Sequence, residues 1–166
     1  MRIPVPATKA LTTGTTRMSH DQLTAASFEL DLFISVSTDR VWNAISAETS
    51  AWWPKEFVTS DRTKSFVIEP RLGGRAFEDF GNGEGLVWYT VVGMDAGREL
   101  ILAGHLLPPF GGPATTALRL TLIPREHGTL LKIRDDRFGI LGGEPPTEGW
   151  RTVFDDGLRR YLESGN

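Results

Sequence analysis

His105 is a candidate for acid–base chemistry, because it lies between an apolar strand-like segment and an apolar loop. The segment Arg98–Gly104 reads RELILAG, and residues 105–114 read HLLPPFGGPA. A histidine at the edge of a cavity can serve as a general base near neutral pH. An ordinary surface histidine is the alternative. His20 and His127 lie far away in the sequence, without the H-x-H or H-E-x-x-H spacing of a metal site, so we expect no metal.

The adjacent acids Asp135 and Asp136 lie near the end of the strand-like segment TLLKIRDDRF, residues 129–138. Alternation with Leu131 and Ile133 points Asp135 toward the buried face. A buried carboxylate is costly unless it is paired, which predicts a polar anchor or an acid in a mostly apolar pocket. An ion pair at the strand end, or plain surface charge, is the alternative. The candidate partners of Asp135 are Arg75, Arg119 and Arg134.

Two further predicted strands carry side chains that could meet a ligand. In the segment RAFEDF, Phe77 and Asp79 share one face and Glu78 lies on the other, so either acid is a candidate. On the next strand Trp88 and Tyr89 are adjacent, and we expect one to line a cavity and the other to face away. Sheet packing and surface salt bridges are the alternative interpretation for all of them.

The composition excludes several classes of protein. The chain has 166 residues and a net charge of -3, which argues against a nucleic-acid binder that relies on a basic surface. It has no cysteine, so disulfides, thiolate catalysis and Cys-ligated zinc are excluded. No apolar run approaches the ~20 residues that a membrane-spanning helix needs, so we expect no membrane insertion. Glycine-rich stretches such as GNGEG lack the strand and helix that a phosphate-binding loop requires.

The elements that must position these residues follow a simple order. Alternation over residues 28–36 predicts a strand. Residues 37–46 follow with a helical pattern, and Ser37 or Thr38 is the expected N-cap. A series of short strands with turn signals between them then predicts an antiparallel sheet. These strands are expected in residues 65–70, 71–80, 86–94, 98–104, 116–123 and 129–138.

A long helix is predicted at the C-terminus, over residues 145–166. Its apolar residues fall at three- and four-residue steps and form one stripe. The stripe consists of Trp150, Val153, Phe154, Leu158, Tyr161 and Leu162. Gly157 interrupts this stripe at a cost of ~1 kcal/mol relative to alanine, so either something packs closely against it or space is left beside it. One sheet with helices segregated around it is an α+β fold.

The segment SAWWPKEF places Trp52 next to Trp53 and ends in a helix-terminating proline. Two adjacent indoles cannot both point into one core from a strand or a helix. We therefore expect one of them to face the interior and the other to cover the rim of an internal cavity.

The first residues differ from the rest of the chain. Residues 1–17 are rich in Thr and Pro and carry three basic residues and no acid. We expect residues 1–26 to form a disordered or weakly ordered tail and residues 27–166 to form one domain. A transit peptide, or a natural start at Met18, is the alternative for this segment, and a secretory signal is not expected. The expected location is the cytoplasm.

The element order and four stretches resemble the START-like (SRPBCC) superfamily of helix-grip folds. Within it, the chain is most similar to the family named after the homologue of the activator of the heat-shock-protein-90 ATPase. The stretches are the first strand with STDRVWNAIS, the WWP segment, IEPRLGGRAFEDF, and EGW followed by FDDGLRRYLE. The resemblance implies a curved antiparallel sheet of six or seven strands that grips the C-terminal helix, with one or two short helices after the first strand.

The resemblance also implies a cavity between helix and sheet, used across the superfamily for lipids, steroids, polyketides and other apolar ligands. Family members often carry a bulky aromatic residue where Gly104 and His105 stand here. Loss of that side chain is expected to enlarge the cavity, and the apolar loop after His105 is expected to lid the opening or to meet a partner.

We therefore expect the chain to bind a small apolar or amphipathic molecule, without a cofactor. One alternative is a cyclase- or hydrolase-type enzyme that acts on a polyketide-like substrate, with Asp135, Asp79 and His105 as acid or base candidates. Another is a protein that stimulates a chaperone ATPase; a chaperone or a second copy of the chain is the candidate protein partner. The expected ligand-binding residues are Trp52, Trp53, Phe77, Trp88, Tyr89, His105, Leu120, Asp135, Trp150, Phe154 and Gly157.

Overall fold

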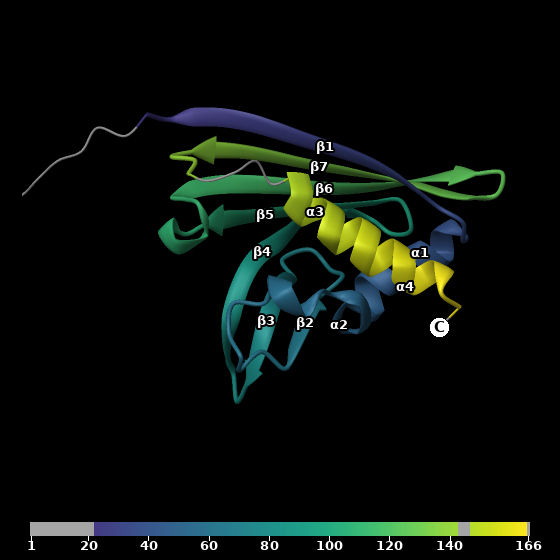
Figure 1. Cartoon of the computed structure of the whole chain (residues 1–166), viewed down its shortest axis with the longest axis horizontal. Coiled ribbons are helices and arrows are strands. Elements are labelled where there is room, and N and C mark those ends of the chain that lie inside the picture. Colours follow the sequence, from purple (N-terminus) through teal and green to yellow (C-terminus); the bar gives the residue numbers. More distant parts are fainter. Residues whose placement is uncertain (1–21, 143–146, 166) are drawn as a thin grey trace, which may run out of the picture.

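The computed structural model describes residues 22–142 and 147–165, in which an antiparallel sheet of seven strands curves around a C-terminal helix (Figure 1). The strand order is β1-β7-β6-β5-β4-β3-β2, so the first strand pairs with the last and the other neighbours are consecutive in sequence. The strands are β1 (Thr24–Ile34), β2 (Ser65–Ile68), β3 (Arg75–Gly81), β4 (Glu84–Asp95), β5 (Glu99–Leu106), β6 (Ala114–Arg125) and β7 (Gly128–Gly139).

Short helices follow β1 and a longer helical segment ends the chain. They are α1 (Thr38–Ala47), α2 (Thr49–Trp52), the 3₁₀ turns η1 (Lys55–Phe57) and η2 (Pro108–Phe110), α3 (Thr147–Arg151), the π-helical η3 (Thr152–Arg159) and α4 (Arg160–Glu163). The predicted α+β class and the helix-grip arrangement are confirmed. Most of the predicted tail, residues 1–21 with His20, lies outside the described residues, and the domain boundary at residue 27 stays a prediction.

Alternation in β1 produces a strand that is buried on one face. Leu30, Leu32 and Ile34 are buried, whereas the residues between them are exposed. The strand begins at Thr24, earlier than the alternation indicated, because β7 continues to Gly139 and pairs with Thr24 there. Backbone pairing rather than side-chain pattern therefore sets the start of β1.

The helices after β1 begin and end where their local chemistry requires. The Ser37 hydroxyl accepts a hydrogen bond from the backbone N–H of Arg40 and caps α1, as predicted. The backbone of Trp53 is extended because a residue before proline avoids helical geometry, and Pro54 therefore separates α2 from η1. In Figure 1, α1 lies beside α4 at the C-terminal end of the long helix.

The C-terminal helix runs without a break through α3, η3 and α4. Val153, Phe154, Leu158 and Leu162 are buried, so the predicted apolar stripe faces the sheet. The middle of this helix is π-helical, a form with i→i+5 hydrogen bonds that is rare in proteins. No helix among the described residues is long and apolar enough to cross a lipid bilayer.

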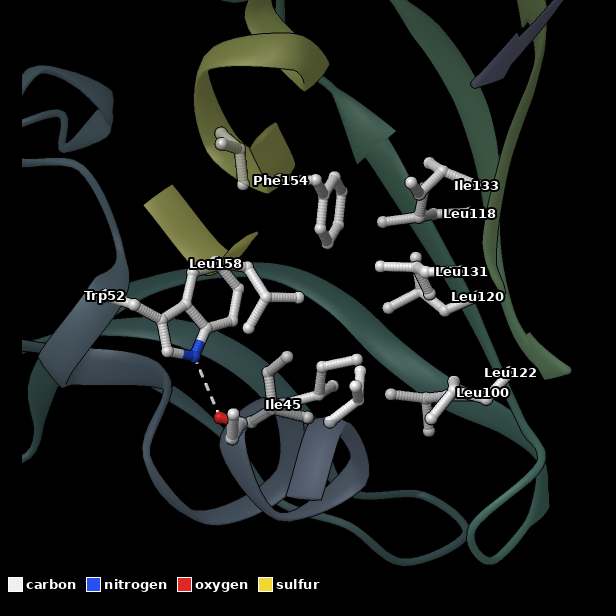
Figure 2. Close-up of a cluster of buried hydrophobic side chains, with 14 of the residues drawn as sticks. Ile45, Trp52, Leu100, Leu118, Leu120, Leu122, Leu131, Ile133, Phe154 and Leu158 are labelled. Carbon is white, nitrogen blue, oxygen red and sulfur yellow. Dashed lines mark hydrogen bonds between the residues drawn. The ribbon is translucent and has the colours of Figure 1, made fainter. Parts of the chain in front are cut away.

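The core lies between this helix and the concave face of the sheet (Figure 2). Phe154 and Leu158 point from the helix toward the sheet, while Trp52 and Ile45 reach the same space from α2 and α1. Burial of each such side chain stabilises the fold by roughly 1.5–3 kcal/mol. The sheet residues that face them are Leu100, Leu118, Leu120, Leu122, Leu131 and Ile133.

The sheet bends sharply at β4, and two pockets lie beside this bend. Pairing between β4 and β5 begins at Tyr89↔Gly104, so the part of β4 before Tyr89 has no partner in β5. Register shifts also occur on the β3 side of β4 and between Val91 and Gly93. Such bulges bend a strand and increase its twist. Figure 1 shows β4, β3 and β2 turning away from the other strands.

Candidate functional site

A pocket of about 390 Å³, which we call the mouth pocket, opens where the bent sheet meets the start of the C-terminal helix. Its walls come from η1, β2, β4, η2, the ends of β5 and β7, and α3. Small-molecule sites typically have volumes of about 300–1,000 Å³ and mostly apolar walls. The residues that line it are Trp53, Glu56, Phe57, Val58, Thr59, Phe66, Trp88, Tyr89, Leu106, Phe110, Arg137, Gly149 and Trp150.

The two adjacent tryptophans occupy different places. Trp52 is buried in the core, and its indole N–H donates to the carbonyl of Ala44 at 2.8 Å (dashed line in Figure 2). Trp53 stacks on Phe66 with ring centroids 3.7 Å apart and lines the mouth pocket. Its indole N–H donates to the carbonyl of Phe57. This is the arrangement expected for one interior indole and one rim indole.

Trp88 and Tyr89 both line the mouth pocket, which corrects the expectation that they face opposite sides. On β3, Ala76 pairs with Tyr89 but the next residue, Phe77, pairs with Val87. Trp88 is therefore the extra residue of a β-bulge, and a bulge breaks the simple alternation of faces. The bulge adds a second aromatic side chain from β4 to the pocket wall.

Glu78 is fully buried behind Trp88 and holds this wall in place. The Trp88 indole N–H donates to Oε1 of Glu78 at 2.9 Å. Oε2 of Glu78 accepts hydrogen bonds from the backbone N–H and hydroxyl of Thr59 and from the hydroxyl of Thr63. No ion pair of the described residues involves Glu78, so hydrogen-bond donors alone compensate the burial of this carboxyl group.

Asp135 forms a second buried polar cluster, at the other side of the pocket. It is 1% exposed, in agreement with the alternation of β7. Its partner is Arg137, not one of the three arginines expected: Nη2 of Arg137 lies 2.7 Å from Oδ2 and Nε donates to the same oxygen. The Trp150 indole N–H also donates to Oδ2, and the Thr116 hydroxyl donates to Oδ1. Arg137 reaches Asp135 because residues two apart on a strand share a face.

The expected arginines are held elsewhere. Arg134 pairs with Glu29 and Asp136 on the opposite face of β7. Arg75 pairs with Glu69. Arg119 lies 3.9 Å from Glu99 on the neighbouring strand. Each of these arginines therefore has an acidic partner on the outer side of the sheet or in a turn, away from Asp135.

The hydroxyl of Tyr89 belongs to the Asp135 cluster. Burial and the negative charge of Asp135 raise the pKa of Tyr89 far above its ordinary value of 10, and a hydrogen bond with Thr116 opposes this shift. The phenol therefore stays protonated in neutral solution. Because the Thr116 hydroxyl proton goes to Asp135, the Tyr89 hydroxyl donates to Thr116 and can accept a further hydrogen bond from a ligand.

The space deeper between helix and sheet is almost filled. A residual void of about 20 Å³ remains there, and Trp52, Leu120 and Phe154 are among the residues around it. That volume is close to the minimum needed for one water molecule. These three expected ligand-binding residues thus belong to the packed core, whereas Trp53, Trp88, Tyr89 and Trp150 line the open pocket.

Two glycines are closely packed, which selects close packing over extra space at Gly157 and corrects the expectation that Gly104 enlarges the cavity. A Cβ atom at Gly157 would lie 2.8 Å from the carbonyl oxygen of Trp52 and 3.3 Å from Cγ of Pro54. A Cβ atom at Gly104 would lie 2.0 Å from the carbonyl oxygen of Trp88. Gly157 therefore allows α2 to approach the helix, and Gly104 allows β4 to approach β5, without enlarging the cavity.

Three other candidates lie outside the mouth pocket. His105 is exposed on the outer face of β5, because side chains alternate along the strand and the neighbouring Leu106 is the one that points inward. Phe77 faces the same outer side on β3, where the guanidinium carbon of Arg75 lies 4.4 Å from its ring centroid. Asp79 accepts a hydrogen bond from the backbone N–H of Gly81 at the hairpin turn.

Sequence reasoning missed several residues of the mouth pocket. Arg137 shares the strand face of Asp135, so the same alternation that indicated Asp135 could have found it. Phe110 and Phe57 lie in 3₁₀ turns without any periodicity, and only the folded chain brings them to the rim. The apolar loop after His105 does border the opening, through Leu106 and Phe110.

Comparison of the sequence with protein-family models and with curated proteins finds no match. Solved structures, in contrast, share the fold. A protein from Rhizobium leguminosarum is 16% identical with a TM-score of 0.64, and the match covers 88% of this chain and 99% of that one. The AHSA1-like protein from Aeromonas hydrophila is 16% identical with a TM-score of 0.57, and the match covers 84% and 93%.

Two further solved structures extend this likeness. Ara h 8.0201 is 14% identical with a TM-score of 0.60, and the match covers 86% of this chain and 100% of that one. DynU16, a protein of the dynemicin biosynthetic locus, is 21% identical with a TM-score of 0.58, and the match covers 84% and 48%. At such identities the likeness shows the fold alone, which is the helix-grip fold.

Proposed function

We propose that this helix-grip chain binds a small apolar or amphipathic molecule with a flat, aromatic body in the mouth pocket. The observation that carries the proposal is the pocket itself, about 390 Å³ with Trp53, Trp88, Trp150 and several phenylalanines in its wall. Apolar burial supplies most of the binding free energy in such a site, and aromatic walls favour flat partners.

The indole walls are fixed before a ligand arrives. The N–H group of Trp88 is bound to Glu78 and that of Trp150 to Asp135. Both indoles therefore offer their apolar surfaces to the pocket while their polar atoms are already satisfied. A pocket that is ordered in advance loses less conformational entropy on binding.

Polar groups at one side of the pocket would orient the ligand. Arg137 uses Nε and Nη2 for Asp135, which neutralises its charge. The remaining N–H groups of Arg137 suit an uncharged acceptor such as a carbonyl or hydroxyl oxygen, and the Tyr89 hydroxyl oxygen suits a donor such as a hydroxyl group. We therefore propose a ligand with a flat apolar body and one or two neutral polar groups.

The enzyme alternative receives less support from the geometry. Of its acid or base candidates, Asp135 accepts hydrogen bonds and an ion pair from its own neighbours, while His105 and Asp79 lie outside the mouth pocket. No observation favours the chaperone alternative over ligand binding.

Fluorescence titration with dansylamide, a short aromatic probe with an uncharged polar end, tests the proposal. Gly149 lines the pocket, and Gly149→Leu places a side chain inside it. Glu148→Leu is the matched control, because Glu148 is exposed and outside the pocket. We expect saturable binding that Gly149→Leu weakens by at least about tenfold, or about 1.4 kcal/mol, and Glu148→Leu leaves unchanged. Absence of binding, or equal effects of both variants, would contradict the proposal.

A further inference from the structure

A second hollow adjoins the mouth pocket on the far side of two aromatic rings. This hollow, the side pocket, has a volume of about 230 Å³ and lies where β4 leaves β5. Trp88, Tyr89 and Phe110 line both pockets and therefore form the wall between them. The ring centroids of Trp88 and Phe110 are 4.9 Å apart. The other residues that line the side pocket are Leu86, Val87, Thr90, Ala103, Gly104, His105 and Leu107.

The wall depends on one exposed side chain from a short turn. Phe110 is 37% exposed and belongs to η2, a turn of three residues, whereas Trp88 is fastened to Glu78. A rotation of the Phe110 side chain would join the two pockets without breaking any hydrogen bond of Trp88. Side chains that are partly exposed change rotamer on the picosecond to nanosecond timescale.

The side pocket has polar side chains in its wall near the solvent, whereas the wall of the mouth pocket is mostly apolar. His105 and Thr90 contribute polar side chains there, and His105 is exposed. Backbone groups add to this, because β4 before Tyr89 has no partner in β5 on this side. An unpaired strand edge presents N–H and C=O groups. The hollow therefore suits an apolar chain that ends in a hydrogen-bonding group.

We infer that the side pocket is a second subsite of the proposed ligand site, and that the ligand has two parts. Its flat body occupies the mouth pocket, and a flexible apolar tail passes between Trp88 and Phe110 into the side pocket. The polar end of the tail lies near His105. This inference rests on the proposed function, because it requires the body to bind in the mouth pocket.

Two dansyl probes that differ in their tail test the inference. Dansylamide has the flat body alone, and 11-(dansylamino)undecanoic acid adds an apolar chain with a carboxylate end. We expect the long probe to bind the intact chain at least about tenfold more tightly, a difference of about 1.4 kcal/mol. Thr90→Trp, which fills the side pocket, should remove this advantage without changing dansylamide affinity.

Val92→Trp is the matched control, because Val92 shares the outer face of β4 with Thr90 but is not part of the side pocket. It should keep the advantage of the long probe, and so show that a new indole on β4 is harmless. Equal affinity of both probes for the intact chain would overturn the inference and leave the mouth pocket intact as a site. A long-probe advantage that survives Thr90→Trp would also overturn it. Failure of both probes to bind would refute the proposed function itself.

Discussion

The indole N–H of Trp150 donates to Oδ2 of Asp135 at 2.8 Å and fastens the first turn of the C-terminal helix to the last strand. Arg137 and Thr116 share the same carboxylate. The cluster thus links the helix to the neighbouring strands β6 and β7 and forms one side of the mouth pocket. Its integrity is expected to matter for stability and for binding together.

Asp135→Asn should lower the free energy of unfolding by about 3 kcal/mol, because it leaves the charge of Arg137 largely buried without a partner. Urea denaturation measures the change. Asp136→Asn is the control, since Asp136 is about half exposed and its ion pair with Arg134 should contribute less than about 1 kcal/mol. Equal losses in both variants would show that the buried cluster has no special role.

Glu78→Gln should lower the free energy of unfolding by about 2 kcal/mol, because a glutamine amide cannot accept all the hydrogen bonds that both carboxylate oxygens now accept. The amide oxygen should take the place of Oε2, which accepts three hydrogen bonds, so the Trp88 indole N–H loses its acceptor and should exchange with solvent faster. Glu84→Gln on the same hairpin removes an exposed ion pair and should change neither quantity appreciably. Unchanged exchange of the Trp88 indole N–H in Glu78→Gln would contradict this account.

Gly157→Ala should destabilise the fold, even though alanine is ~1 kcal/mol more favourable than glycine inside a helix. The new Cβ atom would lie 2.8 Å from the carbonyl oxygen of Trp52, and the backbone there must move. Overpacking of this kind typically costs about 1–3 kcal/mol. In the matched variant Gly149→Ala, the Cβ atom meets the Phe57 ring at 3.3 Å, so that variant should be neutral or slightly stabilising. Thermal unfolding compares the two, and a stabilised Gly157→Ala would refute the close packing of α2.

The contact between Glu48 and Tyr161 should make stability depend on pH. The Tyr161 hydroxyl donates to Oε2 of Glu48 at 2.8 Å, and Arg40 lies 2.9 Å from the same oxygen. The hydrogen bond from Tyr161 is the main cause that lowers the pKa of Glu48 below 4.5. Because the pKa of Glu48 is lower in the folded chain than in the unfolded chain, the ionised carboxylate stabilises the fold at pH values above the unfolded pKa. This contribution is lost as the pH falls from the unfolded pKa through the folded pKa.

Tyr161→Phe should therefore cost about 1 kcal/mol near pH 6, where Glu48 is ionised, and clearly less near pH 3. The comparison uses urea denaturation of both proteins at each pH. Contacts of the tyrosine ring with Arg40 do not titrate in this range and cancel in the difference. A cost that stays constant or grows toward low pH would contradict the assigned sign.

Most of the fold could be predicted from the sequence because each element has a strong local signal. Alternation indicated β1 and the burial of Asp135, and the steps of the apolar stripe indicated the faces of the C-terminal helix. The site was harder, because it depends on departures from these patterns. The bulge at Trp88 adds a residue that alternation cannot reveal, and the contact partners of Gly157 come from α2 across the core. The partner of Asp135 was within reach, since Arg137 follows the same parity.

The most direct test of the central claim is a nitrogen–proton NMR spectrum of the indole N–H groups, recorded with and without dansylamide. The chain has five tryptophans, of which Trp53, Trp88 and Trp150 line the mouth pocket, whereas Trp42 and Trp52 do not. We predict that the signals of the three pocket indoles move on addition of the probe and that the signal of Trp42 stays in place. Movement of Trp42 alone, or of no indole signal at all, would contradict the claim that the mouth pocket is the ligand site.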